Sequence, residues 1–155
     1  MREIKFRAWY KEEKKMLPVQ NLDFLCEYAN VREPHNLYLW DFKDIELMQF
    51  TGGYDDNKAE IYIGDIIFSE NEDGFCIFLA EYGEYEKMPE TIFEAYYLKP
   101  LKHFDFLYEK EEWSGNDKTT TEFVNKYNPD HKSFVIIGNK YENPELLEVG
   151  RWYIG

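Results

Sequence analysis

MQFTGGYDDNKAEIYIGDIIF, residues 48–68, is the stretch that decides the fold of this chain. It contains most of one β-type apolar run, Glu46–Thr51, and all of a second, Glu60–Phe68. Glycine, aspartate and asparagine residues that tolerate tight or left-handed backbone lie between the two runs. The second run is short, bounded by glycines and rich in β-branched residues, which favours a buried strand over a helix. We expect a bend at Gly64, with the Asp65 carboxylate accepting backbone amides, because an unpaired charge between apolar runs is costly.

Further strand patterns occur on both sides of this stretch. The expected strands are 3–9, 16–24, 75–82, 91–98 and 134–137. Short strands separated by turn residues predict a mainly β fold with a minor α component, a small antiparallel barrel that is SH3-like in part. The alternation in residues 3–9 is typical of an edge strand with one face toward a core. The pattern leaves the type of 37–40 open, and it indicates a loop for 109–121.

The end of the chain predicts a short C-terminal helix. Asn143 is expected to cap it by accepting an amide proton, and Pro144 suits the first helical position. Glu145 favours the positive end of the helix dipole, and Gly150 is expected just past the last turn. Only about two turns fit, so packing of Leu146 and other apolar residues would have to hold the helix.

Length and composition indicate one soluble domain over residues 1–155. The net charge is −13, which argues against a nonspecific grip on nucleic acid. No apolar run approaches the roughly 20 residues of a membrane span, and residues 1–16 lack a signal-peptide core. Cys26 and Cys76 stand alone without metal-binding spacing. A reduced cytoplasmic protein is the simplest interpretation, with a single disulfide as the open alternative.

Three ordered blocks carry a family resemblance. They are Ile4–Trp9 followed by Lys14–Met16, then Met48–Ile67, and finally Ile137–Asn139 with Tyr141–Leu147. Together they resemble the YopX-like proteins, which are encoded by phages and prophages of bacteria. This chain has Gly53 where leucine is usual and Ala59 where lysine or glycine is common, changes that affect turn detail more than fold. The motif residues expected to be structural are Trp9, Thr51, Gly52, Tyr62, Gly64, Asp65, Gly138, Asn139, Tyr141, Asn143 and Pro144.

Motifs for catalysis, metal binding or cofactor binding are not apparent. His35, His103 and His131 lie far apart, and none belongs to a metal-binding spacing. A calcium loop counted from Asp55 fails, since Glu60 occupies the glycine position. Phosphate-loop and nucleophile signatures are also missing. We therefore expect no catalytic residue, metal or cofactor, and a protein that is not an enzyme; an uncharacterised hydrolase is the less favoured alternative.

Charge is distributed unevenly along the chain. Residues 55–94 hold twelve acidic side chains against two lysines, a net −10, whereas the first sixteen residues carry +3. Simple solubility explains such asymmetry, and so does head-to-tail self-association between the basic first hairpin and an acidic face. The candidate interaction face consists of Glu70, Glu72, Asp73, Glu81, Glu84 and Glu86.

Resemblance and charge together suggest a function class. The family is phage-encoded and has no established activity, so the resemblance implies a non-catalytic accessory protein in the cytoplasm of a bacterial host. We expect a homo-oligomer, a ring or small multimer, that binds a host or phage protein and neither nucleic acid nor membrane. The edge-like strand 3–9 would be a template for the second chain. The alternative is an acidic DNA mimic that inhibits a host nucleic-acid-binding protein.

Overall fold

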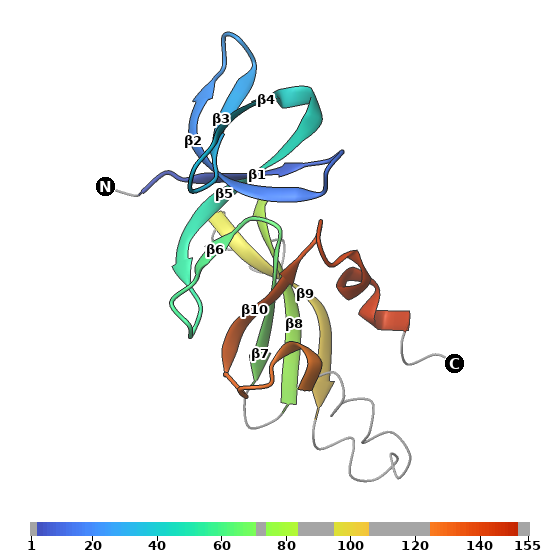
Figure 1. Cartoon of the computed structure of the whole chain (residues 1–155). Coiled ribbons are helices and arrows are strands. Elements are labelled where there is room, and N and C mark those ends of the chain that lie inside the picture. The colour runs from blue at the N-terminus through green and yellow to red at the C-terminus, as the bar shows by residue number, and fades with distance from the viewer. Residues whose placement is uncertain (1–2, 71–73, 84–94, 106–124, 152–155) are drawn as a thin grey trace. The chain divides into compact units, whose positions relative to one another are not determined.

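The computed structural model of the chain describes residues 3–70, 74–83, 95–105 and 125–151. Ten strands and two 3-10 helices lie in these residues, and residues 125–127 are α-helical (Figure 1). The chain divides into two compact units, Met1–Gly53 and Tyr54–Gly155. The predicted mainly β class is confirmed, and the prediction of a single domain over residues 1–155 stays a prediction.

The first unit is built from five strands and one short helix. The elements are β1 (Phe6–Tyr10), β2 (Lys15–Asp23), β3 (Tyr28–Arg32), β4 (Leu37–Asp41), η1 (Phe42–Asp44) and β5 (Ile45–Tyr54). Their strands are hydrogen-bonded in the order β4-β3-β2-β1-β5, and every pairing described there is antiparallel. The core is formed by Ala8, Leu17, Ala29, Val31, Trp40 and Ile45. Tyr10 stacks on Trp40 with ring centroids 4.9 Å apart, which extends this core to the hairpin strand β1.

The prediction that residues 3–9 form an edge strand is wrong. In β1, Ala8 lies opposite Leu17 of β2 on one side and Leu47 of β5 on the other. Alternation along a strand reports which face is buried, but it does not report how many neighbours the strand has. The strand at the end of the order is β4, whose sequence pattern left its type open.

The second unit contains the strands that follow Tyr54. They are β6 (Glu60–Tyr62), β7 (Asp65–Glu70), β8 (Gly74–Gly83), β9 (Ala95–Asp105) and β10 (Phe134–Asn139), followed by η2 (Pro144–Arg151). One antiparallel sheet has the order β10-β7-β8-β9 (Figure 1). Strand β7 is central and buried from Asp65 to Phe68. Ile66 and Phe68 pack into a cluster with Leu146, and Ile67 packs with Ile61 and Ala80, so both faces of β7 are covered.

The strand orders do not close. Neither returns to its first strand among the described residues, so open sheets replace the small closed barrel that the sequence predicts. Closure would require the two end strands of an order to pair with each other. The pattern of short strands and turns is the same in open and closed sheets, which is why it misled the prediction.

Element boundaries otherwise follow the sequence closely. The expected strands 16–24, 75–82 and 134–137 are confirmed as β2, β8 and β10. The 91–98 strand is confirmed from Ala95 onward as β9; its beginning and the 109–121 loop lie outside the described residues. The C-terminal helix is confirmed as η2, which is a 3-10 helix and includes Gly150 rather than ending before it. No helix in the described part of the chain is long and apolar enough to cross a membrane.

Candidate functional site

The sheet pairings bring the motif residues of the second unit together. Asn139 lies opposite Asp65, and Gly138 lies opposite Ile66, where β10 pairs with β7. The register shifts between Ile136 and Gly138, so this end of β10 contains a bulge. The middle and closing motifs are far apart in sequence, but the pairing of β10 with β7 brings them together as one polar region around the start of β7.

Asp65 and Gly64 perform the roles expected from the sequence. The Asp65 side chain is fully buried, and its Oδ2 accepts the backbone N–H of Tyr62 at 2.8 Å. Gly64 has a φ of 95°, in the left-handed region that favours glycine. Its N–H donates to the carbonyl of Ala80, and its carbonyl accepts from Lys140. The predicted bend and the predicted carboxylate–amide contact are both confirmed.

A second pair of carboxylates, predicted from the sequence as turn residues and rejected as a calcium loop, joins the β5–β6 turn to β10. Asp55 is buried; its Oδ1 accepts from Asn57 and Ala59 at 2.9 Å, and its Oδ2 accepts from Ile136 at 3.1 Å. Asp56 is exposed, and its Oδ2 accepts from the N–H of Phe134 at 2.8 Å. Both oxygens of Asp55 are therefore used within the fold. The signal available in the sequence was the Asp-Asp-Asn turn itself, which favours side-chain to backbone bonds.

The closing motif is a compact set of side-chain to backbone bonds. Asn139 Oδ1 accepts from Tyr141 at 3.0 Å and from Glu142 at 2.9 Å. Asn143 Oδ1 accepts from Asn139 N at 3.3 Å, so this oxygen serves the turn before η2. The expected role of Asn143, accepting an N–H from inside the helix, is replaced by this contact. A Cβ on Gly138 would lie 2.4 Å from that oxygen, which explains why glycine is needed there.

The remaining motif residues also have structural surroundings. Trp9 is buried in β1, and the hydroxyl of Thr51 accepts from the N–H of Gly53 at 3.2 Å. Gly52 has a φ of 88° near the end of β5. Tyr62 is buried and donates its hydroxyl to Glu60 at 2.8 Å, and Pro144 is the first residue of η2. Within the described ranges, no group of three or more histidine, cysteine, aspartate or glutamate side chains could hold a metal ion. Cys26 and Cys76 are free thiols, and burial raises the pKa of Cys76.

The expected acidic interaction face is only partly described. Glu70 and Glu81 are half-buried. They lie at opposite ends of the β7–β8 hairpin, because Glu70 pairs with Phe75 whereas Glu81 lies two residues beyond Leu79, the partner of Ile66. The other members, Glu72, Asp73, Glu84 and Glu86, lie outside the described residues. The structure does not bring the two described glutamates together.

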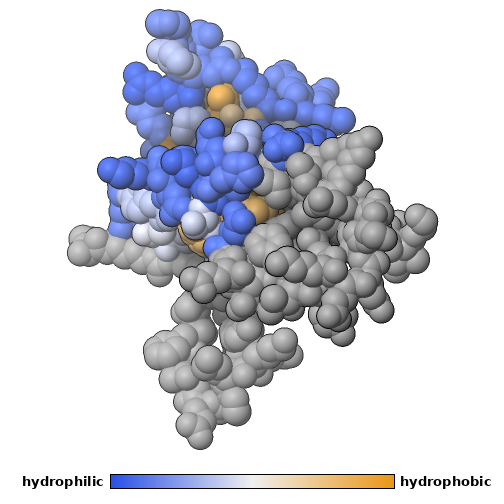
Figure 2. Space-filling view, turned by 90° about the horizontal axis from the view of Figure 1, so that it is seen from below, coloured by the Kyte–Doolittle hydropathy of each residue, from blue (hydrophilic) through white to orange (hydrophobic). Residues whose placement is uncertain are grey.

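Exposed apolar side chains gather instead on strand β4 of the first unit. Leu37 and Leu39 are 60% and 66% exposed, whereas Trp40 on the other face is buried. In the view of Figure 2, hydrophilic residues cover most of the coloured surface, with few hydrophobic residues between them. Phe24 and Leu25 in the turn after β2 are exposed as well, and Phe24 makes an edge-to-face contact with Phe42 just after β4. Exposed apolar residues scattered singly are ordinary, but two on one end strand make β4 the candidate for a contact surface.

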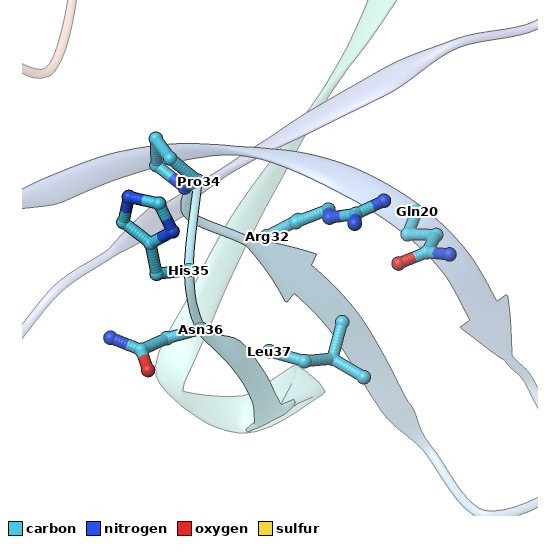
Figure 3. A pocket seen from close by; sticks show the side chains of 6 residues that line it. All are labelled: Gln20, Arg32, Pro34, His35, Asn36 and Leu37. Carbon is cyan, nitrogen blue, oxygen red and sulfur yellow. The ribbon is translucent and has the colours of Figure 1, made fainter.

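A shallow pocket of about 330 Å³ lies beside the start of β4. It is lined by Gln20, Arg32, Pro34, His35, Asn36 and Leu37. Arg32 extends toward Gln20 from the neighbouring strand, and Leu37 lies close to both in the view of Figure 3. The pocket and the exposed leucines thus form one surface along the end of the sheet, which we call the β4 edge.

Charged and aromatic side chains join the β3–β4 hairpin to the start of β2. Lys15 forms an ion pair with Glu33, and its ammonium lies 5.4 Å from the centroid of the Tyr38 ring. Tyr38 donates its hydroxyl to Glu33 at 3.1 Å. The hydrogen bond from Lys15 lowers the pKa of Glu33, and the same bond raises the pKa of Lys15. These contacts position β4 without using its outer edge.

Comparisons with known proteins agree with this architecture. Residues 5–148 match the family model described as YopX protein. The crystal structure of protein EF1440 from Enterococcus faecalis superimposes with a TM-score of 0.51 at 22% sequence identity, covering 95% of this chain and 99% of that one. At that identity the likeness shows the fold alone. No curated protein matches the chain.

Proposed function

This chain belongs to the YopX family, and we propose that it is a non-catalytic protein-binding module that self-associates through its first unit. The observation that carries the proposal is the pair of exposed leucines on β4, the strand at the end of the sheet order. End strands present unpaired backbone groups to any added strand, and apolar side chains on them favour a protein partner over water.

The chemistry of the second unit supports a scaffold role. The buried polar side chains found there, Asp55, Asp65, Asn128 and Asn139, each accept backbone N–H groups. A carboxylate that is buried and hydrogen-bonded in this way stabilises a turn and is poorly placed to meet a substrate. We assign the interaction to the first unit for this reason.

Net charge also favours the first unit. Residues 1–53 hold nine acidic and eight basic side chains, a net −1, whereas residues 54–155 hold 22 acidic and ten basic, a net −12. Two copies that meet through nearly neutral surfaces avoid the repulsion that two acidic surfaces would suffer. The resemblance to phage and prophage proteins supports the proposal that such a module acts as an accessory protein in the bacterial cytoplasm.

Light scattering after gel filtration tests the proposal. We expect the wild type to elute with a mass above 18.8 kDa at micromolar concentration, and Leu37→Lys with Leu39→Lys to return it to 18.8 kDa. The matched control is Ile4→Lys with Leu147→Lys, which adds the same charge at exposed positions outside β4 and should keep the larger mass. A monomeric wild type, or an assembly unaffected by the β4 changes, contradicts the proposal.

A further inference from the structure

We infer that the occupant of the β4 edge is β4 of a second copy, paired antiparallel about a two-fold axis. The inference rests on the proposed function and specifies its partner, orientation and register. It follows from three features of the first unit: the direction of the β4 backbone groups, the pairing of its side chains, and the charges at its two ends.

Backbone direction follows from the β3–β4 hairpin. Glu33 and Asn36 exchange both backbone hydrogen bonds, at 2.9 and 3.3 Å, across the Pro34–His35 turn. Opposite residues of an antiparallel pair alternate between bonded and non-bonded. The register Val31↔Tyr38 therefore continues the bonded set, and Arg32↔Leu37 belongs to the non-bonded set. It follows that Leu37, Leu39 and Asp41 direct their N–H and C=O groups toward the outer side of β4, where no described strand pairs.

The residues with outward backbone groups also carry the exposed side chains. Leu37, Leu39 and Asp41 are exposed, whereas Tyr38 and Trp40 face the core side. A strand added at this edge would therefore form backbone hydrogen bonds with Leu37, Leu39 and Asp41, the same residues whose side chains are exposed. Two copies of one strand can only be related in this way by an isologous two-fold axis, which closes the assembly as a dimer.

Side-chain pairing selects the register. With the axis at Tyr38, Leu37 of each copy lies opposite Leu39 of the other. A shift that places the axis at Leu39 would set Leu37 opposite the partner's Asp41, a carboxylate that accepts from Lys43 N at 3.1 Å as the cap of η1. Apolar cross-strand pairs stabilise a sheet, whereas covering a carboxylate with leucine costs free energy. The geometry therefore favours the axis at Tyr38.

The charges at the two ends of β4 are complementary in this orientation. Arg32 and His35 line the pocket at the turn end, where Glu33 is already paired with Lys15. At the other end Asp41 forms an exposed ion pair with Lys43 at 3.7 Å, and Glu27 is held there by its carbonyl, which accepts from Phe42 N; these three side chains together carry a net charge of −1. Antiparallel pairing brings the basic end of one copy to the acidic end of the other, and a parallel arrangement would oppose like charges.

The decisive experiment mixes two oppositely charged variants of the full chain. Leu37→Lys with Leu39→Lys, and Leu37→Glu with Leu39→Glu, should each be monomeric at 18.8 kDa, because like charges face each other across the axis. An equimolar mixture should recover a species of twice that mass. If both variants are monomeric and the mixture stays monomeric, the occupant of the edge is not β4 of a second copy and the inference fails. Assembly of the wild type that depends on β4 would then still support the proposed function.

Cysteine cross-linking tests the register. In a Cys26→Ser, Cys76→Ser background, we expect a disulfide between a Leu37→Cys chain and a Leu39→Cys chain, and much slower cross-linking of either chain with itself. Melting temperatures close to the wild-type value are the control for folding. Rapid cross-linking of the Leu39→Cys chain with itself, and no disulfide between the Leu37→Cys and Leu39→Cys chains, places the axis at Leu39 and overturns the register.

Discussion

The two units of this chain differ in which side chains they bury: the second buries polar side chains, and the first exposes apolar ones. The second unit carries a net charge of −12, yet it buries Asp55, Asp65 and Asn139 and binds them to its own backbone. The first unit is nearly neutral, yet it exposes Leu37 and Leu39 on an end strand. Under the proposed function the contact surface lies in the nearly neutral unit, so the acidity of the chain as a whole does not predict its position. We therefore propose the second unit as the scaffold and the first as the contact surface.

The largest effect is expected at Asp55. Asp55→Ala leaves three backbone N–H groups without their acceptor, two in the turn and one in β10. Buried donors left unsatisfied cost about 1–3 kcal/mol each, so we expect the free energy of unfolding to fall by about 3 kcal/mol or more. Chemical denaturation followed by circular dichroism measures the loss. Asp56→Ala is the matched control, since Asp56 is exposed and accepts one bond, and it should cost about 1 kcal/mol or less. Equal effects of the two changes would contradict the scaffold role of Asp55.

Asp65→Leu should also destabilise the second unit. The substitution keeps side-chain bulk but removes the acceptor of Tyr62 N, in a site with no exposure to water. We expect a loss of about 2 kcal/mol, which lowers the melting temperature by several degrees. A thermal melt of the purified variant measures it. An unchanged melting temperature would mean that the Asp65 carboxylate is not needed by the fold and belongs to a functional site.

Gly138→Ala tests how tightly the closing motif is packed. The new methyl group would lie 2.4 Å from Asn143 Oδ1 and 2.7 Å from its Cγ, so the Asn143 side chain must move and its bond from Asn139 N is lost. Overpacking of this kind costs about 1–3 kcal/mol, and we expect the lower end because the clash involves a side chain. Ala substitution should cost less in an Asn143→Ala background, which a double-mutant cycle would measure. If the free-energy costs of Gly138→Ala and Asn143→Ala simply add, the close packing of position 138 against the Asn143 side chain is contradicted.

The smallest effect is expected from pH, and in the first unit. Glu33 has a pKa below its ordinary value because Lys15 donates to its carboxylate. A lowered pKa means that this stabilisation is present above the unfolded-state pKa of glutamate and is lost as pH falls through the folded-state value. The melting temperature should therefore fall below about pH 4.5, the usual region for glutamate. The Glu33→Gln variant should show a shallower fall over that range, and an identical pH profile would contradict the contribution of this pair.

Local patterns predicted much of the second unit. The apolar run around Gly64 fixed the bend, and the placement of an acidic residue inside that run predicted that Asp65 accepts a backbone amide. Turn chemistry could not show that Asp55 also reaches Ile136, because that contact depends on the pairing of β10 beside the turn, which is long-range information. The Asn143 contact with Asn139 was missed for a different reason. The side-chain oxygen of Asn143 can accept an N–H either from the helix or from the turn before it, and the sequence does not distinguish the two.

The first unit was predicted less well, and the reason is physical. Alternation in residues 3–9 predicted a strand with two faces but could not show that β2 and β5 flank it on both sides. For the same reason the sequence pattern did not show that β4 is the strand at the end of the sheet order. Leu37, Tyr38, Leu39 and Trp40 are all apolar or aromatic, so the sequence carries no alternation from which the exposed face of β4 could be read. An exposed apolar face is the feature that a pattern-based prediction assigns to a core.

Residue-resolved amide hydrogen exchange of the wild type by NMR tests the central claim most directly. In a single copy of the first unit, the N–H groups of Tyr38 and Trp40 are bonded to β3, whereas those of Leu37 and Leu39 point to the outer side of β4. Pairing at the β4 edge predicts that all four amides are protected, because a second copy bonds the outer set. Protection that alternates, with Leu37 and Leu39 exchanging at the rate of an unstructured chain, would contradict pairing at the β4 edge.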